Sequence, residues 1–241
     1  MAAGRRHGGS VVLVVFLLLG VLVALGLYAG DGYALRRAES AAGSQLQGRL
    51  GTPAAPTVDI EGRPFLTQVA ARHLRTVHVV ADDLGAAAGT GSTVPVQHAD
   101  LVLSDVTTTD WFQSMTAKHV DGTALLAYGD LGSLSSVPLS YAGDGRLQVV
   151  QATSIFGATL SATITGTPQL DVGAQTLTLA DPAISLGSVN LPKATADALM
   201  QSLLKPIPVE GLPFGLTLSS ISAEDDGLHA GLTGNDIEFR R

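Results

Sequence analysis

The residues that could do covalent or metal chemistry are scattered along this sequence without a recognisable spacing. The six histidines form no H-E-x-x-H pair or comparable metal-binding pattern, and no G-x-S-x-G nucleophile elbow occurs. The acidic pairs Asp82–Asp83 and Asp225–Asp226 lie outside any D-x-[DN]-x-[DN]-G calcium loop, so we expect solvated turns there. The sequence therefore predicts a protein that is not an enzyme, with no metal site and no cofactor.

Apolar residues offer the clearer signal, because charge is scarce. Charged residues make up 15% of the chain, against an average of about 25%. A sheet with so little charge can enclose an apolar tunnel, in which an acyl chain gains about 0.8 kcal/mol per buried methylene. We predict that such a lipid-binding site is lined or gated by seven residues: Phe65, Leu66, Phe156, Leu160, Ile164, Phe214 and Leu216.

The first thirty residues differ from the rest. Val11 to Ala29 contains no charged side chain, and a helix of this length covers roughly 28 Å, close to the thickness of a bilayer core. Arg5 and Arg6 precede the run and Asp31 follows it. The positive-inside rule then leaves the N-terminus in the cytoplasm.

This reading divides the chain into three parts. We expect a cytoplasmic N-terminus at residues 1–10, a transmembrane anchor at 11–29 and an extracytoplasmic lipid-binding domain at 30–241. The protein would cross the cell membrane once. The alternative is secretion after cleavage of a signal peptide.

Cysteine usage and net charge exclude several classes of function. The chain has no cysteine, so disulfides, thiol catalysis and thiolate metal sites are excluded. Its net charge of −7 argues against a nucleic-acid partner, which would require basic patches.

Several elements can be located from periodicity. Tyr33 to Gly51 is predicted to be an amphipathic helix that ends at Gly51 and Pro53, and residues 191–206 a second one. In the first helix the apolar positions recur every three or four residues: Leu35, Ala38, Ala42, Leu46 and Leu50.

Shorter elements follow the first helix. We expect a strand at Val58–Ile60, a helical turn or two, and a strand near Val77–Val80. The small residues from Gly85 to Thr93 predict a loop, and Thr109 to Leu131 predicts a short helix followed by an apolar segment.

The centre of the chain is its most regular part. Residues 146–157, 158–171 and 174–187 are predicted to be successive antiparallel strands, and a hairpin is predicted to turn at Asp226–Gly227. Leu160, Ala162 and Ile164 alternate with polar residues, which places the two kinds on opposite faces. The predicted fold class is α+β, with a curved antiparallel sheet wrapped around amphipathic helices.

The motif E-G-x-P-F occurs twice, at Glu61–Phe65 and at Glu210–Phe214. Each copy follows a predicted helix and leads into an apolar segment. We infer two related helix-then-strand units within one sheet; the alternative is two unrelated turns.

At these residues the sequence resembles the LmeA-like family of actinobacterial cell-envelope proteins, which are regarded as phospholipid-binding. The resemblance rests on P-F-L-T-Q (Pro64–Gln68), D-G-T-A-L-L-A-Y (Asp121–Tyr128), L-P-F-G-L-T-L (Leu212–Leu218) and G-L-H-A-G-L-T-G (Gly227–Gly234). Family members often have a glycine soon after the first block, where this chain has Ala70–Ala71–Arg72–His73.

The resemblance implies a lipid-binding α+β fold similar to tubular lipid-binding domains, with no established catalytic residues. It also implies a periplasmic location and, because one member supports mannan elongation, a contribution to envelope lipoglycan assembly. We therefore predict a membrane-anchored protein that holds or transfers a phospholipid or related envelope lipid. Its predicted partners are that lipid, the membrane and an envelope-biosynthesis protein.

Two other classes of function remain open. The chain could be a structural adaptor for an envelope enzyme, with a fully packed interior and no bound lipid. It could also be an enzyme acting on lipid-linked glycans, with Asp and His residues brought together from distant strands.

Overall fold

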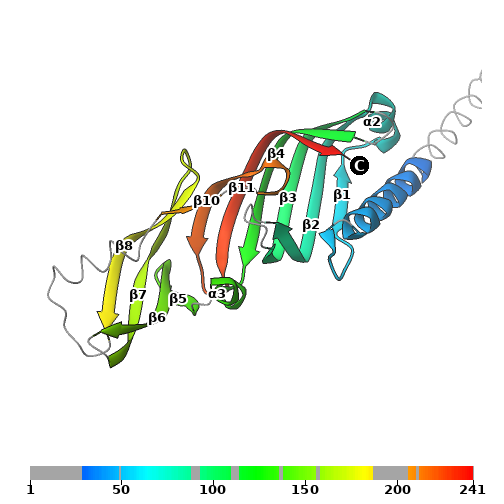
Figure 1. The fold of residues 1–241 in the computed structure, drawn as a ribbon. Helices are drawn as coiled ribbons and strands as arrows, with labels where there is room; N and C mark the ends of the chain where they lie inside the picture. The colour runs from blue at the N-terminus through cyan, green and yellow to red at the C-terminus, as the bar shows by residue number, and fades with distance from the viewer. Residues whose placement is uncertain are drawn as a thin grey trace, which may run out of the picture.

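Long antiparallel strands dominate the structure and form two sheets (Figure 1). The computed structural model describes residues 29–48, 50–87, 93–109, 114–135, 138–155, 158–186, 206–209 and 212–240. The two sheets adjoin where β10 of the first lies against β7 of the second. Within this part of the chain the sheets are not closed into a barrel.

The larger sheet has six strands in the order β1-β2-β3-β4-β11-β10. Every neighbouring pair is antiparallel. Its strands are β1 (Thr57–Glu61), β2 (His73–Ala87), β3 (Thr93–Thr109), β4 (Ser114–Leu126), β10 (Thr217–Ala223) and β11 (Leu228–Arg240).

The smaller sheet has five antiparallel strands in the order β5-β6-β7-β8-β9. They are β5 (Leu139–Gly143), β6 (Arg146–Ile155), β7 (Ala158–Asp171), β8 (Thr176–Leu186) and β9 (Ile207–Pro208). The three central strands confirm the prediction for this region. Short helices are α2 (Phe65–Ala71) and α3 (Tyr128–Ser135), with a 3-10 turn η1 (Pro213–Gly215).

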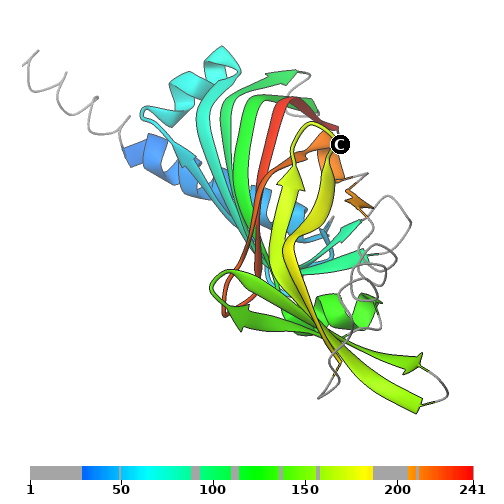
Figure 2. The same ribbon diagram turned by 90° about the vertical axis from the view of Figure 1, so that its left-hand side faces the viewer.

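A helix at residues 29–48, called the N-terminal helix below, packs on the six-stranded sheet. Leu35 is buried in the main core, and Ala38, Ala42 and Leu46 pack against it, so the predicted apolar stripe is confirmed. Gly51 adopts a φ of 66° and its amide donates to the Gln47 carbonyl, which closes the last turn as predicted. In Figure 2 the long strands bend around this helix.

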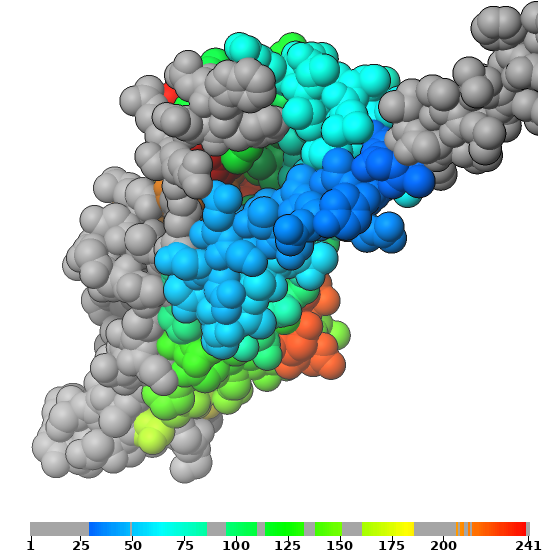
Figure 3. Space-filling model, turned by 90° about the vertical axis from the view of Figure 1, so that its right-hand side faces the viewer, coloured from blue at the N-terminus to red at the C-terminus, as the bar shows by residue number. Residues whose placement is uncertain are grey.

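Buried polar groups fix the start of the N-terminal helix against α2. Asp31, only 5% exposed, accepts hydrogen bonds from the amides of Phe65 (2.9 Å) and Leu66 (2.7 Å). These are first-turn amides of α2, which no side chain of its own caps. Glu39 accepts from the Ile60 amide, so the helix is bonded to β1 as well. Figure 3 shows the start of this helix (dark blue) beside α2 (cyan).

The P-F-L-T-Q block owes its residue types to this packing. Phe65 is 5% exposed in the main core. Gln68 is 7% exposed; its amide nitrogen donates to the carbonyls of Glu61 and Gly62, and its oxygen accepts from the Arg75 amide. Arg72 ends α2 in the left-handed conformation, at a φ of 55°. That conformation favours glycine, so an arginine here adopts a backbone that few residues with a Cβ take.

A line of irregular residues crosses the middle strands of the larger sheet. In β4 the buried Ala117 and Val120 are separated by two exposed residues, so the alternation of faces breaks there. The neighbouring strands place Asp105 and Asp236 opposite Lys118, and both aspartates have left-handed φ angles, 51° and 52°. Such bulge-like breaks bend and twist a sheet.

One prediction about topology is wrong, because the predicted single sheet is two sheets. The strands that follow the two E-G-x-P-F motifs, β2 and β10, do share the larger sheet, whereas β9, which precedes the second motif, belongs to the smaller one. The order of elements is nevertheless similar, because a short strand precedes each motif and a short helix or turn follows it. Alternation along a strand does not specify which neighbour the strand pairs with.

Three local predictions also need correction. Asp82 and Asp83 lie inside β2 and not in a turn, and Asp83 adopts a φ of 51°. The predicted loop from Gly85 starts later, since β2 runs to Ala87. From Ser114 the predicted short helix is strand β4, and the helix of this region, α3, follows it.

Some predictions lie outside the described residues. The second amphipathic helix at 191–206 does so apart from its last residue, and so do residues 11–28 of the membrane anchor. Among the described residues no helix has the length and apolar character needed to cross a membrane.

The hairpin predicted at Asp226–Gly227 is confirmed between β10 and β11. The Glu224 amide donates to the Gly227 carbonyl, and the Tyr128 hydroxyl from α3 donates to the carbonyls of Glu224 (2.6 Å) and Gly227 (2.9 Å). Burial raises the pKa of the Tyr128 hydroxyl, because the phenolate would lose solvation there.

We predict that replacing Asp31 with Ala lowers the free energy of unfolding by about 2–3 kcal/mol, since two buried amides lose a charged acceptor. Asp31→Asn should lie in between, because one oxygen remains. The exposed Asp59 of β1 is the matched control, and Asp59→Ala should change stability by less than about 0.5 kcal/mol. Urea unfolding measures all three; equal effects at the two positions would contradict the capping role of Asp31.

We predict that Tyr128 makes stability depend on pH in the alkaline range. Its pKa is raised on folding, so its contribution is complete below its ordinary pKa of 10.0 and is lost as the pH rises through the folded-state value. The free energy of unfolding should therefore fall more steeply with pH above about 10 in the native protein than in Tyr128→Phe. Denaturant unfolding at stepped pH measures both slopes, and identical slopes would disprove this linkage.

Candidate lipid-binding face

The six-stranded sheet has an apolar face, called the inner face below, on the side of the N-terminal helix. Its first group of buried residues packs with Leu35 of that helix. This main core consists of Leu35, Val58, Ile60, Phe65, Leu74, Val106, Ala117, Val120 and Ile237.

A second buried group continues along the same strands. It consists of Val96, Ala99, Ala124, Leu218 and Ala230. Ala124 lies four residues after Val120 in β4, so the two-residue period of a strand places both on the inner face. The apolar residues packed on this second group come from β2, β4, β7, β8, β11 and the segment at 209–212. The inner face is therefore apolar over both parts of the sheet.

The described part of the N-terminal helix spans only part of this face. Residues 29–48 extend about 30 Å at 1.5 Å per residue. The 17 residues of β3 extend about 56 Å at 3.3 Å per residue. The helix also turns small side chains, Ala34, Ala38 and Ala42, toward the core. Residues 29–48 therefore leave apolar sheet surface that they do not cover.

Half-buried apolar side chains mark this incompletely covered surface. Val79 of β2, Leu103 of β3, Met115 of β4 and Phe239 of β11 pack at the edge of the main core. Val80, which follows Val79 in β2, points to the opposite face, since successive strand residues alternate. The sequence analysis missed all four residues, although the alternation in β2 and β3 was a usable signal.

The structure places four of the seven predicted lipid-site residues around the end of the sheet that carries α2. Phe65 is in the core, whereas the adjacent Leu66 is 44% exposed. Leu216 packs against the main core, and Phe214 is 51% exposed with its ring 5.0 Å from that of Phe239.

The other three residues belong to the smaller sheet or lie beyond the described chain. Ile164 of β7 is 4% exposed, as its place in the alternation predicted. Leu160 is also in β7, where its backbone pairs with Thr153. Phe156 lies outside the described residues. Lipid contact by the seven residues stays a prediction.

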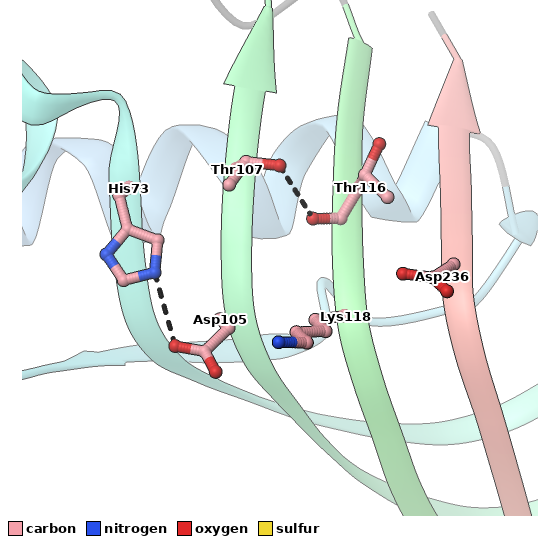
Figure 4. Close-up of a pocket in the computed structure, with 6 residues that line it drawn as sticks. All are labelled: His73, Asp105, Thr107, Thr116, Lys118 and Asp236. Carbon is pink, nitrogen blue, oxygen red and sulfur yellow. Dashed lines mark hydrogen bonds and ion pairs between the residues drawn. The ribbon is translucent and has the colours of Figure 1, made fainter.

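A polar pocket lies on the opposite face of the six-stranded sheet. It has a volume of about 380 Å³ and is lined by His73, Asp105, Thr107, Thr116, Lys118 and Asp236. Figure 4 shows these side chains in front of the strands, with a helix passing behind. His73 bonds to Asp105 at 3.2 Å, and the Thr107 hydroxyl donates to the Thr116 carbonyl. Its polar lining does not suit an acyl chain, and none of the seven predicted residues lines it.

Histidines on this outer side pair with carboxylates from neighbouring strand positions. His78 pairs with Asp100, His98 with Asp82, and His119 with Asp121. His78 and His98 lie far in sequence from their partners, so spacing did not reveal these two pairs, whereas His119 and Asp121 are two residues apart in β4. Each pair is partly exposed and lies outside the apolar inner face.

One group in the described chain could offer three ligand atoms to a metal ion. Glu224, Asp226 and His229 bring such atoms within 4.8 Å of one another at the β10–β11 hairpin. His229 bonds to Asp226 at 2.8 Å, and this hydrogen bond lowers the pKa of the Asp226 carboxyl. The bonds within the hairpin account for the arrangement.

A curved antiparallel sheet with an apolar inner face, partly covered by one helix, defines a class of proteins that can shelter an apolar ligand. Comparison with protein families identifies the family within this class: the family model described as LmeA-like phospholipid-binding matches residues 29–233. The chain belongs to this family, as its motifs indicated. Searches of the curated proteins and of the solved structures found no match.

Phe65 and Phe214 occupy matching motif positions but should respond differently to substitution. We predict that Phe65→Ala lowers the free energy of unfolding by about 3–5 kcal/mol, because it empties a core position. Phe214→Ala should cost about 1 kcal/mol, the value of one aromatic contact. Urea unfolding measures both, and equal losses would contradict this division between core and surface.

Proposed function

We propose that this protein is a non-enzymatic phospholipid carrier that holds the acyl chains of its cargo against the inner face of the six-stranded sheet. The observation that carries the proposal is the inner face itself, which is apolar beyond the part that residues 29–48 of the N-terminal helix cover. Membership of a phospholipid-binding family supports the same cargo. The proposal contains no covalent step.

The energetics favour an acyl chain over water at this face. Each methylene transferred from water gains about 0.8 kcal/mol. Half-buried side chains such as Val79 and Leu103 would become fully buried on the same event. No charged side chain is among the buried residues of either apolar group, so no desolvated charge opposes binding at the described positions.

The location we propose follows from the N-terminal apolar run at residues 11–29. As a retained anchor it would hold the carrier at the outer surface of the cell membrane, beside a source of phospholipid. Support of envelope lipoglycan assembly is the role that the family resemblance implies for such a carrier. An envelope-biosynthesis protein would then receive the lipid.

Native mass spectrometry and solvent extraction of the purified chain from residue 29 onward test the proposal. One phospholipid per protein would support it and identify the cargo. An empty protein that also fails to take up added phospholipid would refute it and favour the adaptor function.

Val79 and Val80 offer a matched pair for locating the site. Both are half-buried valines of β2, but they lie on opposite faces of the sheet. We predict that Val79→Trp reduces retained phospholipid several-fold, because the indole occupies the space of the acyl chain. Val80→Trp should retain the native amount. Lipid phosphorus per folded protein is the measurement, with circular dichroism to confirm folding; equal retention by the two variants would place the lipid elsewhere.

A further inference from the structure

We propose that the end of the six-stranded sheet carrying α2 and η1 docks on an anionic phospholipid surface, with Leu66 and Phe214 in the interface. This inference builds on the proposed carrier function by naming which end meets the membrane. It rests on exposed apolar side chains, on the distribution of charge and on the contact of Asp31, which closely follows the apolar run at residues 11–29, with α2.

Exposed apolar side chains gather at this end. Five large apolar residues of the described chain are exposed: Tyr33, Leu66, Val102, Val172 and Phe214. Tyr33 lies two residues after Asp31, whose carboxylate binds the Leu66 amide. Burying Leu66 and Phe214 in a lipid interface would remove apolar surface from water on two separate elements.

The register of the sheet brings the two elements to the same end. Thr108, Met115 and Phe239 form one row across β3, β4 and β11. The Thr108 amide donates to the carbonyl of Arg72, the residue that ends α2. The ring of Phe214 packs on Phe239 in this row. From β2 to β11 is three strand spacings, about 14 Å, so one flat surface can touch both elements.

Phe214 is held outward at a conformational cost. Its φ is 61°, in the left-handed region, which is unfavourable for a residue with a Cβ. Its side chain remains 51% exposed. A bulky aromatic in this conformation gains little from the fold itself, and contact with an apolar phase would supply a reason for it.

Charge is distributed so that this end suits anionic lipids. Between residues 29 and 75 there are six arginines and four acidic residues, and one of the four, Asp31, is buried. From residue 76 to the end there are six Lys and Arg against seventeen Asp and Glu. Arg63, Arg72 and Arg75 are exposed on and beside α2. Basic residues are attracted to anionic lipid, whereas the acidic remainder would be repelled.

The chain before the described part supports the same orientation. The uncharged run that begins at Val11 ends at Ala29, the first residue that the structure describes. Asp31, two residues later, is bonded to α2. If this run lies in the bilayer, α2 lies near the bilayer surface, because it is bonded to a residue that closely follows the run.

Single-cysteine labelling of the full chain tests this docking, because the native sequence has no cysteine. Leu66→Cys and Phe214→Cys each carry an environment-sensitive nitrobenzoxadiazole label. Val172→Cys, at an equally exposed turn of the smaller sheet, is the matched control. The full chain is reconstituted into phosphatidylcholine vesicles with or without phosphatidylglycerol, and quenching by doxyl-labelled lipid is measured.

We expect several-fold stronger quenching at positions 66 and 214 than at 172, with a further increase when phosphatidylglycerol is present. Reversing charge with Arg63→Glu and Arg75→Glu together should remove that increase, whereas Arg146→Glu in the smaller sheet should not. Quenching at 66 and 214 no stronger than at 172 would overturn the proposal. Phospholipid retained by the same variants is measured separately, so that loss of retention with normal quenching counts against the carrier function alone.

Discussion

The contact on which the structure depends most is the one between the Asp31 carboxylate and the first turn of α2. A carboxylate buried in the first described turn of one helix satisfies two amides that open another, 34 and 35 residues later in the chain. Leaving it unpaired would be costly, so the N-terminal helix has little freedom to move at this end. Glu39, about two turns further along the helix, acts in a similar way by accepting from the Ile60 amide. Together these two contacts fix the helix over the part of the inner face that contains the main core. Apolar residues from other segments pack on the part that contains the second buried group.

Curvature of the sheet follows from a second constraint. A flat sheet would meet the helix only along a line, whereas the irregular row through Asp105, Lys118 and Asp236 bends the strands around it. Aspartate tolerates left-handed backbone better than other charged residues, which accounts for its presence at two of these positions. The same row sends polar side chains to the outer face in succession. Shape and polarity of the two faces thus share one cause.

Local periodicity in the sequence was sufficient to predict elements that can be recognised from their own residues, without knowledge of what they pack against. The stripe from Leu35 to Leu46 predicted the N-terminal helix, and alternation around Ile164 predicted β7 and its buried face. Pairing across the fold was not predictable in this way, since alternation gives a face but no neighbour. That is why one sheet was expected where β9 and β10 belong to two. The pairs His78–Asp100 and His98–Asp82 could not be read from the sequence for the same reason. Asp83 was expected in a turn, where left-handed backbone is common, but it adopts that conformation inside β2.

The P-F-L-T-Q block shows how a motif can serve fold and function through different residues. Phe65 and Gln68 are buried and hold α2 against the sheet, so their types follow from packing and hydrogen bonding. Leu66 lies between them, and its amide is bonded while its side chain faces solvent. The fold requires the Leu66 backbone but gives its apolar side chain no partner in the described core. A rigid backbone carrying an exposed apolar side chain is what an interface with an apolar phase needs, because little conformational entropy is then lost on contact. The same reasoning applies to Phe214, whose backbone is strained and whose ring rests on Phe239.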